Sequence, residues 1–339
     1  METGILKLAI GALAAAAIAT PAMATDLQYF NTIYDTDFTA VGIGGLRGGS
    51  GSASLNLSGV TGGPINKAYL YWHGPSNASV ADAPTANANV SFGGNNVTGT
   101  YLGISSDNCW GFANSIAYRA DVTSFVTGNG NYALADYIKP DVQINGFSLI
   151  VFYKDPASAN RRDVVLFDGN DSNIQNAHDA DGWNITLAGI NYTSGTANAQ
   201  FHVADGQAFP DAALIANGQT LAPTGPIFEG TAAQDGGSGI PDNGLLWDVK
   251  DFNVTGLLTP GLNTLNITSG VYSDCLACVL IAIDLPVGAA PPPPGVPEPG
   301  SRSSQISLLS VAAVRRRLRA SGECTPATTH SGSSRHVCA

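Results

Sequence analysis

The sequence predicts an all-β protein made of two tandem β-sandwich or jelly-roll-like domains, with a signal peptide before them and a proline-rich, disordered tail after them. Runs rich in Val, Ile, Tyr, Phe and Thr alternate with clusters of Gly, Asn, Asp and Pro, which is the pattern of strands joined by turns. No long segment keeps the period of about 3.6 residues that an amphipathic helix requires. Between positions 25 and 299 only Glu229 and Glu298 are glutamates, and the other acids are aspartates, which favour turns over helix interiors.

The expected strands follow one another at short intervals, and turn-forming residues bound most of them. Many short strands with this spacing are typical of sandwiches and jelly rolls, in which antiparallel sheets bury their facing sides. The clearest examples lie at residues 68–72, 89–92, 148–153, 163–167, 183–187, 263–268 and 278–284.

A weak internal duplication divides these strands between two domains. The segment 121–128 is echoed by 253–260, and each leads through Gly and Asn to a strand and then to an apolar run. The matched segments keep one order and nearly one shift of about 130 residues, a typical domain size, which favours duplication over a chance likeness of glycine-rich stretches. We therefore expect domains at 25–167 and 168–285. The other matched pairs are 131–134 with 263–266, 149–152 with 279–282, and 68–73 with 199–203.

The first 24 residues have the features of a cleavable secretory signal. Lys7 precedes an apolar run over residues 8–19, and Ala-Met-Ala at 22–24 is a small-x-small cleavage site. A retained membrane anchor is the alternative, but a bilayer span needs about 20 apolar residues, which is more than this run offers. We expect the secretion machinery to export the chain and cleavage to fall between Ala24 and Thr25, so that the mature protein is secreted.

The charge balance is acidic, with 26 Asp and Glu against 15 Lys and Arg and a net charge of −11. Contact with phosphates requires clustered Lys and Arg, so nucleic acid is not an expected partner. The glycine-rich stretches at 42–45 and 48–51 resemble phosphate-binding loops only superficially, because no helix pattern and no Lys-Ser/Thr pair follows them. A nucleotide site is therefore not expected either.

Three of the five cysteines, Cys109, Cys275 and Cys278, lie in the body of the chain. In an oxidising compartment we expect one disulfide and one remaining thiol. The duplication favours Cys109 paired with Cys275 or with Cys278, and the sequence does not choose between the two. A redox pair at Cys275-x-x-Cys278 is the alternative, but the segment has a strand pattern and not the helix N-terminus that would lower a thiol pKa.

The densest acidic patch is formed by Asp168-Gly-Asn-Asp171 and Asp179-Ala-Asp181-Gly. Hard cations such as Ca²⁺ take several oxygen ligands from Asp, Asn and backbone carbonyls. Two such loops close in space would supply them, so Asp168, Asp171, Asp179 and Asp181 are candidate calcium ligands, and calcium is the only cofactor the sequence suggests. The spacing lacks the acid at the twelfth position of an EF-hand loop. A pair of Asx turns between the domains is the alternative interpretation.

Catalytic motifs are weak in this chain. His73, His178 and His202 share no metal-ligand spacing with one another or with the cysteines. No Gly-x-Ser-x-Gly elbow stands in a strand-to-helix context. Paired aspartates for glycoside hydrolysis depend on their separation in space, which the sequence does not give. We expect no catalytic residue, and an extracellular hydrolase on a jelly-roll scaffold is one alternative function.

Aromatic side chains suggest a second alternative, a carbohydrate-binding module. Tyr69 and Tyr71 share one face of an expected strand, while Leu70 and Trp72 share the other, so one aromatic face could be exposed. Sugar rings stack on exposed aromatics, whereas aromatics inside strands are usually core residues. The remaining tryptophans are Trp110, Trp183 and Trp247.

The motif Val296-Pro297-Glu298-Pro299 resembles the PEP-CTERM sorting signal of Gram-negative envelope proteins. In that family the motif precedes a membrane-spanning helix and a terminal Arg cluster, and an exosortase-type membrane protease processes it. Here a Pro-rich spacer at 286–299 carries the motif, and an Arg cluster lies at 315–319. The resemblance implies delivery to the outer surface of a Gram-negative envelope, with exosortase and extracellular polysaccharide as partners.

The tail at 300–339 departs from that family pattern. Only residues 306–314 are fairly apolar, and about nine residues cannot cross roughly 30 Å of hydrocarbon. We expect this degenerate tail to be disordered and not to anchor the protein in a membrane. A reading-frame shift just after Pro299 would account for the mismatch.

The body also resembles, more loosely, an uncharacterised extracellular β domain of secreted bacterial and archaeal proteins. This resemblance implies a location and an architecture but no activity. The leading expectation is therefore a non-catalytic structural or adhesive protein of the envelope or the extracellular matrix. The residues that carry the resemblance are 68–72, 108–110, 120–123, 148–151 and 163–169.

Overall fold

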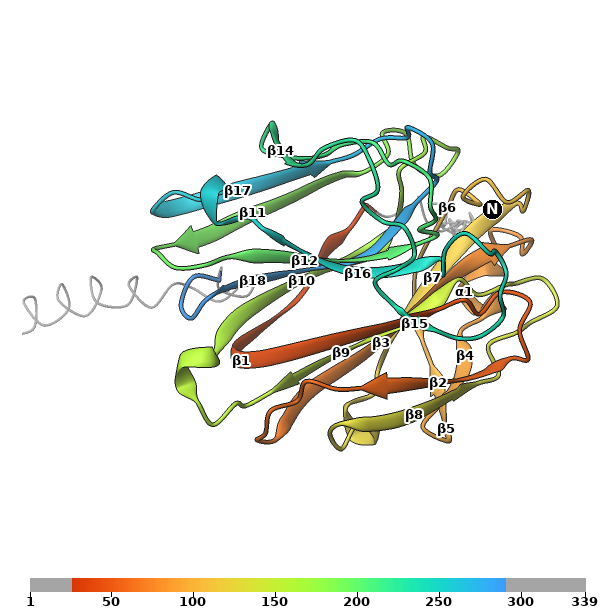
Figure 1. The fold of residues 1–339 in the computed structure, drawn as a ribbon, viewed down its shortest axis with the longest axis horizontal. Helices are drawn as coiled ribbons and strands as arrows, with labels where there is room; N and C mark the ends of the chain where they lie inside the picture. The colour runs from red at the N-terminus through yellow and green to blue at the C-terminus, as the bar shows by residue number, and fades with distance from the viewer. Residues whose placement is uncertain (1–25, 291–339) are drawn as a thin grey trace, which may run out of the picture. The chain divides into compact units, whose positions relative to one another are not determined.

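The computed structural model describes residues 26–290, and its strands stack in four layers (Figure 1). The first half of the chain supplies β1 (Gln28–Gly44), β2 (Ser52–Leu57), β3 (Ile65–Ser76), α1 (Ala83–Ala86), β4 (Asn89–Phe92), β5 (Asn95–Thr98), β6 (Thr100–Ser105), β7 (Asn114–Asp121), η1 (Thr123–Phe125), β8 (Gly130–Ala135) and β9 (Gly146–Tyr153). The second half supplies η2 (Ser158–Asn160), β10 (Arg162–Ser172), β11 (Asn184–Tyr192), β12 (Asn198–Ala204), β13 (Leu214–Ala216), β14 (Gln219–Ala222), β15 (Gln234–Asp235), β16 (Trp247–Asn253), η3 (Thr255–Leu257), β17 (Gly261–Thr268) and β18 (Ala277–Pro286).

A ten-stranded sheet forms the two middle layers, and a four-stranded sheet covers each outer side (Figure 1). The strand order in the large sheet is β16-β12-β18-β10-β1-β9-β3-β7-β6, with β15 paired to β1 off this path. The outer sheets have the orders β2-β8-β4-β5 and β11-β17-β13-β14. Apart from β1 with β15, the paired strands are antiparallel. The predicted all-β class is therefore confirmed.

Strand β1 joins the two middle layers. Its residues 28–36 pair with β10, and its residues 37–43 pair with β9. The large sheet folds back on itself about β1, so that its two parts pack face to face through a buried cluster of side chains (Figure 1). We call the contact between these two parts the central interface. Hydrogen bonds from Tyr71 to Asp168 and between Ser148 and His202 cross it.

The two halves of the chain repeat one topology. From β1 outward the first half runs β1-β9-β3-β7, and from β10 outward the second runs β10-β18-β12-β16. Single hydrogen bonds repeat as well: Thr123 Oγ1 accepts the backbone N–H of Ala68 at 3.0 Å, and Thr255 Oγ1 accepts that of Ala197 at 2.9 Å. Each threonine lies in a short 3₁₀ turn, η1 or η3, within the segments that the sequence matched to each other.

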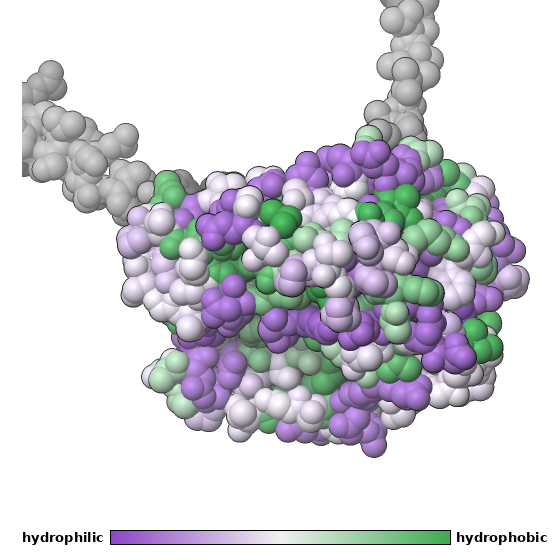
Figure 2. Space-filling model, turned by 45° about the horizontal axis from the view of Figure 1, so that its top comes forward, coloured by the Kyte–Doolittle hydropathy of each residue, from purple (hydrophilic) through white to green (hydrophobic). Residues whose placement is uncertain are grey.

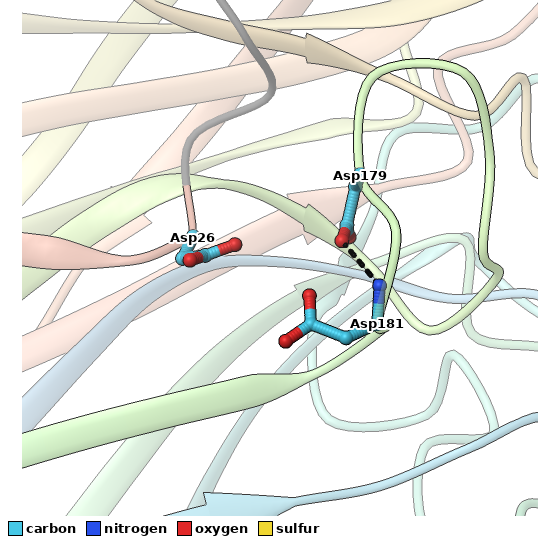
Figure 3. Close-up of side chains that lie close together, drawn as sticks. All are labelled: Asp26, Asp179 and Asp181. Atoms are coloured by element: carbon cyan, nitrogen blue, oxygen red, sulfur yellow. Dashed lines mark hydrogen bonds between the residues drawn. The ribbon is translucent and has the colours of Figure 1, made fainter.

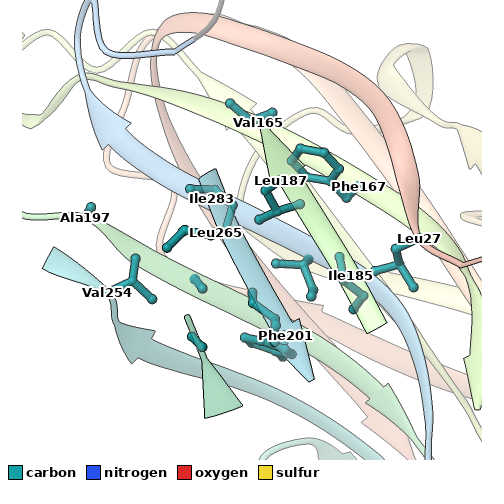
Figure 4. Packing of buried hydrophobic residues seen from close by; sticks show 14 of the residues in the cluster. Leu27, Val165, Phe167, Ile185, Leu187, Ala197, Phe201, Val254, Leu265 and Ile283 are labelled. Carbon is teal, nitrogen blue, oxygen red and sulfur yellow. The ribbon is translucent and has the colours of Figure 1, made fainter. Parts of the chain in front are cut away.

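Each outer sheet encloses a hydrophobic core against the part of the large sheet that it covers. Figure 4 shows the second of these cores, in which Phe201 and Ile283 of the large sheet meet Ile185 and Leu265 of the outer sheet. Strands in the middle layers are covered on both faces, which explains why they read as nearly continuous apolar runs.

The burial of β3 corrects one expectation from the sequence. Leu70 and Trp72 point into the first core, while Tyr69 and Tyr71 join the central interface and are 4% and 0% exposed. The aromatic face that alternation marked as exposed is therefore buried against the second half of the chain. The side of the molecule in Figure 2 has only small hydrophobic patches, separated by hydrophilic residues.

Several predictions concern residues outside the described range. The signal peptide at 1–24 with its cleavage between Ala24 and Thr25, the sorting motif, and the tail at 300–339 all lie there. The predicted division of the body between residues 167 and 168 falls inside β10, the first strand of the second repeat. Within residues 26–290, no helix is long and apolar enough to cross a membrane.

Candidate metal centre

Four aspartates gather where the described chain begins and where β10 ends. Asp26 lies just before β1, Asp171 lies in β10, and Asp179 and Asp181 lie in the connection from β10 to β11. Carboxylate oxygens of Asp26, Asp179 and Asp181 lie within 4.8 Å of one another, and Figure 3 shows the three side chains converging. We call these three residues together with Asp171 the aspartate cluster.

The connection from β10 to β11 is shaped by short-range hydrogen bonds. The backbone N–H of Asp181 donates to Asp179 Oδ1 at 3.1 Å, as drawn in Figure 3, and the Asn184 side-chain amide donates to Asp181 Oδ2 at 2.9 Å. Gly182 has a φ of 69°, and a Cβ there would lie 3.1 Å from the carbonyl oxygen of Asn173. An Asx turn, the alternative interpretation of this patch in the sequence, is therefore present at Asp179, and it holds the two loop carboxylates close together.

Asp171 is the unusual member of the aspartate cluster, because its side chain is 0% exposed and neither carboxylate oxygen accepts a hydrogen bond from any described residue. Asp179 Oδ2 is likewise buried without a donor in that range. Burial, followed by the nearby charges of Asp179 and Asp26, raises the pKa of Asp171 to about 9. A buried acceptor left unsatisfied costs about 1–3 kcal/mol, and more when it is charged.

No positive side chain balances this cluster within residues 26–290, since all of the ion pairs there involve other aspartates. Without a metal, a proton on Asp171, whose pKa is raised to about 9, reduces the repulsion. A bound divalent cation would satisfy the same oxygens and remove the need for the proton. The donor set therefore fits a metal ion.

The chemistry of the donors selects the class of cation. The cluster offers only carboxylate oxygens, which suit hard cations, and Ca²⁺ accepts 6–8 oxygen ligands in flexible geometry. Burial, together with the negative charge of Asp171, raises the pKa of the Cys278 thiol well above its usual value. The thiol therefore stays protonated and is not the thiolate that zinc prefers. Asp26, Asp179 and Asp181 would hold the ion, and backbone carbonyls and water would complete its shell. The carboxyl group of Asp171 interacts electrostatically with all three, so its negative charge would favour binding of the cation.

Asp168, the fourth ligand expected from the sequence, is engaged elsewhere. Its carboxylate forms an ion pair with Arg119 and accepts a hydrogen bond from the Tyr71 hydroxyl at 3.0 Å, both in the central interface. A register irregularity in the pairing of β10 with β18 lies between Asp168 and Asp171. Asp26 takes the place of Asp168, and its sequence position gave no signal because its approach depends on the pairing of β1 with β10.

The disulfide links Cys109 to Cys275, which decides between the two pairings left open by the sequence. Cys278 is a free, buried thiol. The bond joins the β6–β7 connection of the first repeat to the β17–β18 connection of the second.

The histidines at equivalent strand positions, His73 and His202, are both 0% exposed in the middle layers. Burial lowers the pKa of each to about 3, so both rings stay neutral at ordinary pH. Most tryptophans are also core residues, since Trp72, Trp183 and Trp247 are at most 1% exposed. None of these three indoles can stack on a sugar, and Trp110 is the half-buried exception.

A family model described as "Protein of unknown function (DUF3344)" matches residues 49–283, which is most of the described body. No curated protein matches the chain significantly.

Proposed function

We propose that this chain, which belongs to the DUF3344 family of proteins of unknown function, is a non-catalytic structural or adhesive protein of the cell surface or extracellular matrix and is stabilised by calcium. The observation that carries the calcium part is the convergence of the Asp26, Asp179 and Asp181 carboxylates within 4.8 Å of one another. The buried carboxyl group of Asp171, which has no hydrogen-bond donor among the described residues, adds to their negative charge.

Calcium at the aspartate cluster would connect three separate parts of the fold. Asp26 precedes β1, the strand that both middle layers share; Asp171 belongs to β10; and Asp179 and Asp181 belong to the connection that leads to the second outer sheet. A ligand that binds only the folded state stabilises it in proportion to RT ln(1 + [L]/Kd). The ion would therefore act on global stability and not only on one loop.

An extracellular location supports this role. Disulfides persist in oxidising compartments, and extracellular modules bind calcium with Kd values of about 10⁻⁴–10⁻³ M. The predicted signal peptide and the sorting motif at 296–299 agree with export to, or release from, the outer surface of a Gram-negative envelope. Fractionation of cells that express the full chain tests this point, and a product retained in the cytoplasm would contradict it.

We propose no catalytic activity because the side chains most suited to acid–base chemistry are buried and out of contact with solvent. His73 and His202 are fully buried between the middle sheets, where no substrate can reach them. Asp168 is held by Arg119 and Tyr71 in the same interface. A rigid, repeated β-sheet body with a disulfide is suited to bearing load or presenting loops in a matrix.

Thermal unfolding of the mature protein in Ca²⁺ and in EDTA tests the calcium role. We expect Ca²⁺ to raise the Tm of the wild type and of Asp242→Asn, a matched control at an exposed turn. We expect no calcium effect on Asp171→Asn. The variant should fold, because a neutral amide replaces a carboxyl group that the metal-free protein already prefers to protonate. Equal Tm shifts in the two variants would overturn the assignment.

A further inference from the structure

A small pocket of about 220 Å³ lies beside the disulfide, away from the aspartate cluster. Its walls come from three connections: β6–β7 with Asn108 and Trp110, the segment after β12 with Phe209, and β17–β18 with Ser273 and Asp274. The disulfide itself forms part of the wall. The pocket therefore combines loops from both repeats.

The β6–β7 connection is held in one conformation before any ligand arrives. The carboxylate of Asp107 accepts backbone N–H groups of Cys109 at 3.2 Å, Gly111 at 2.6 Å and Phe112 at 2.9 Å. Asn108 and Cys109 are consecutive non-glycine residues with positive φ, 53° and 69°. Such backbone costs energy, and it concentrates where loops are shaped for binding. The disulfide to Cys275 fixes the loop to the second repeat.

The side chain of Trp110 is held in place by contacts with Arg47 and Asp205. The guanidinium carbon of Arg47 lies 3.8 Å from the centre of the Trp110 ring, and the indole N–H donates to Asp205 at 2.7 Å. Arg47 and Asp205 in turn form a buried ion pair at 3.6 Å. An aromatic side chain already held in place loses little conformational entropy when a ligand binds to it.

One exposed aromatic side chain lines this pocket, and another directly precedes a lining residue in the chain. Phe209 is 43% exposed and lines it, and Tyr272, 65% exposed, directly precedes the lining residue Ser273. These are the two most exposed aromatic side chains of residues 26–290. The other aromatics of that range are mostly core residues, so this concentration at one pocket is not a general property of the surface.

We propose that this pocket binds one pyranose ring of a neutral extracellular polysaccharide, with Trp110 and Phe209 as its aromatic walls and with the exposed Tyr272 next to the lining residue Ser273 in the chain. Aromatic rings present flat apolar faces to the C–H side of a sugar, while the exposed Ser273 lies in the lining with a hydroxyl group that can meet a sugar hydroxyl. The volume is below the roughly 300–1,000 Å³ of drug-sized sites, which fits a single ring.

The charge around the pocket favours a neutral sugar over a uronate. Asp107 organises the loop, Asp274 lines the pocket, and the whole chain carries a net charge of −11. A carboxylate on the ligand would meet this negative potential without a free Lys or Arg in the lining. This proposal rests on the extracellular placement given above but not on the calcium site.

Titration of the intrinsic tryptophan fluorescence of the mature protein tests the proposal. The probes are methyl α-glucoside, methyl β-galactoside, N-acetylglucosamine and glucuronate, each in Ca²⁺ and in EDTA. We expect saturable binding of at least one neutral sugar, weaker binding of glucuronate, and at least a tenfold loss of affinity in Phe209→Ala with Tyr272→Ala. The control is Leu262→Ala, whose side chain is 78% exposed on another part of the surface.

Two results would overturn the proposal: no saturable response to any neutral probe, or unchanged binding in the double variant whose Tm matches the wild type. Both aromatic side chains are largely exposed, so the double variant should fold. Sugar binding that persists in a protein with no calcium response would leave the pocket assigned and remove the metal site. A calcium response in a protein that binds no sugar would leave the metal site assigned and remove the sugar pocket. Failure of one proposal can therefore be distinguished from failure of the other.

Discussion

The connections that follow β1 and β10 occupy equivalent places in the two repeats, and each lies beside a buried charge. After β1, Arg47 is 4% exposed, and its charge is met by Asp205 at 3.6 Å and by the ring of Trp110. At the end of β10, Asp171 is 0% exposed, and no Lys or Arg among residues 26–290 forms an ion pair with it. The buried charge of the first repeat is balanced by a side chain of the second repeat, Asp205, whereas no side chain among residues 26–290 balances the buried carboxyl group of Asp171.

The difference shows that equivalent places in a duplicated fold can have buried charges that are neutralised in two different ways. Burial of an unpaired charge is strongly unfavourable, so each site needs its counter-charge. A protein side chain provides a permanent counter-charge, whereas a bound ion provides a counter-charge that depends on the ion concentration and the pH. Changes at each site should therefore have different dependence on calcium and on pH.

The largest expected effect follows from Arg47→Met, which removes the internal counter-charge. Asp205 would remain buried and unpaired, and breaking such a pair by removing one partner costs about 3–5 kcal/mol. Urea denaturation measures the change, and it should be the same in Ca²⁺ and in EDTA. A loss that depends on calcium would show that the two sites are not independent.

Calcium itself should have the next largest effect, confined to the second site. At a free calcium concentration of about 100 times Kd, binding should add about 2.7 kcal/mol to the free energy of unfolding. Urea denaturation at rising calcium concentration measures it. Asp179→Asn should reduce this increment, while Arg47→Met should retain it. An undiminished increment in Asp179→Asn would exclude that residue as a ligand.

The pH dependence should reverse when calcium is bound. In metal-free protein the pKa of Asp171 is raised from 3.8 to about 9, so its contribution to stability is present below pH 4 and is lost as the pH rises towards 9. Calcium needs the ionised carboxylate, so its affinity should increase over the same range, with release of a proton. Calorimetric titration at neutral pH in buffers of different ionisation enthalpy measures that proton. Binding without proton release would contradict the protonated state.

The smallest expected effect compares equivalent threonines. Thr123→Val and Thr255→Val each remove the hydrogen bond from a backbone N–H, of Ala68 or Ala197, at a cost of about 0.5–1.5 kcal/mol. Each also removes the bond that the hydroxyl donates, to Asp121 or to the carbonyl oxygen of Ala197. The two losses should agree with each other and should not depend on calcium. Thermal unfolding resolves them, and a much larger loss in one repeat would show that the equivalence is topological only.

Local patterns were sufficient to predict the class of fold, the repeat and many of the strands, although not β1, the strand that joins the two middle layers. The matched segments fall on β3 with β12, β8 with β17, and β9 with β18, because strand alternation and turn residues are encoded within a few neighbouring positions. The disulfide was predicted only to a choice between Cys275 and Cys278, which lie three residues apart in sequence.

What depended on distant pairing could not be predicted. The stacking of the two repeats buries Tyr69 and Tyr71, and no property of β3 alone indicates a second covering layer. The placement of Asp26 beside Asp179 depends on the pairing of β1 with a strand well over a hundred residues later. Asp168 and Asp171 look equivalent in the sequence, and the register irregularity between them is a property of the folded sheet.

Terbium luminescence tests the metal site most directly, because the reporter is part of the site. The Trp183 indole donates a hydrogen bond to the carbonyl oxygen of Asp171, so excitation of Trp183 should sensitise a Tb³⁺ ion bound in place of Ca²⁺. We expect Tb³⁺ emission from the wild type and from Asp242→Asn, with one ion bound per chain, and we expect Ca²⁺ to abolish it by displacing Tb³⁺. We expect little emission from Asp171→Asn. Equal emission from Asp171→Asn, or none from the wild type, would contradict a calcium ion at the aspartate cluster.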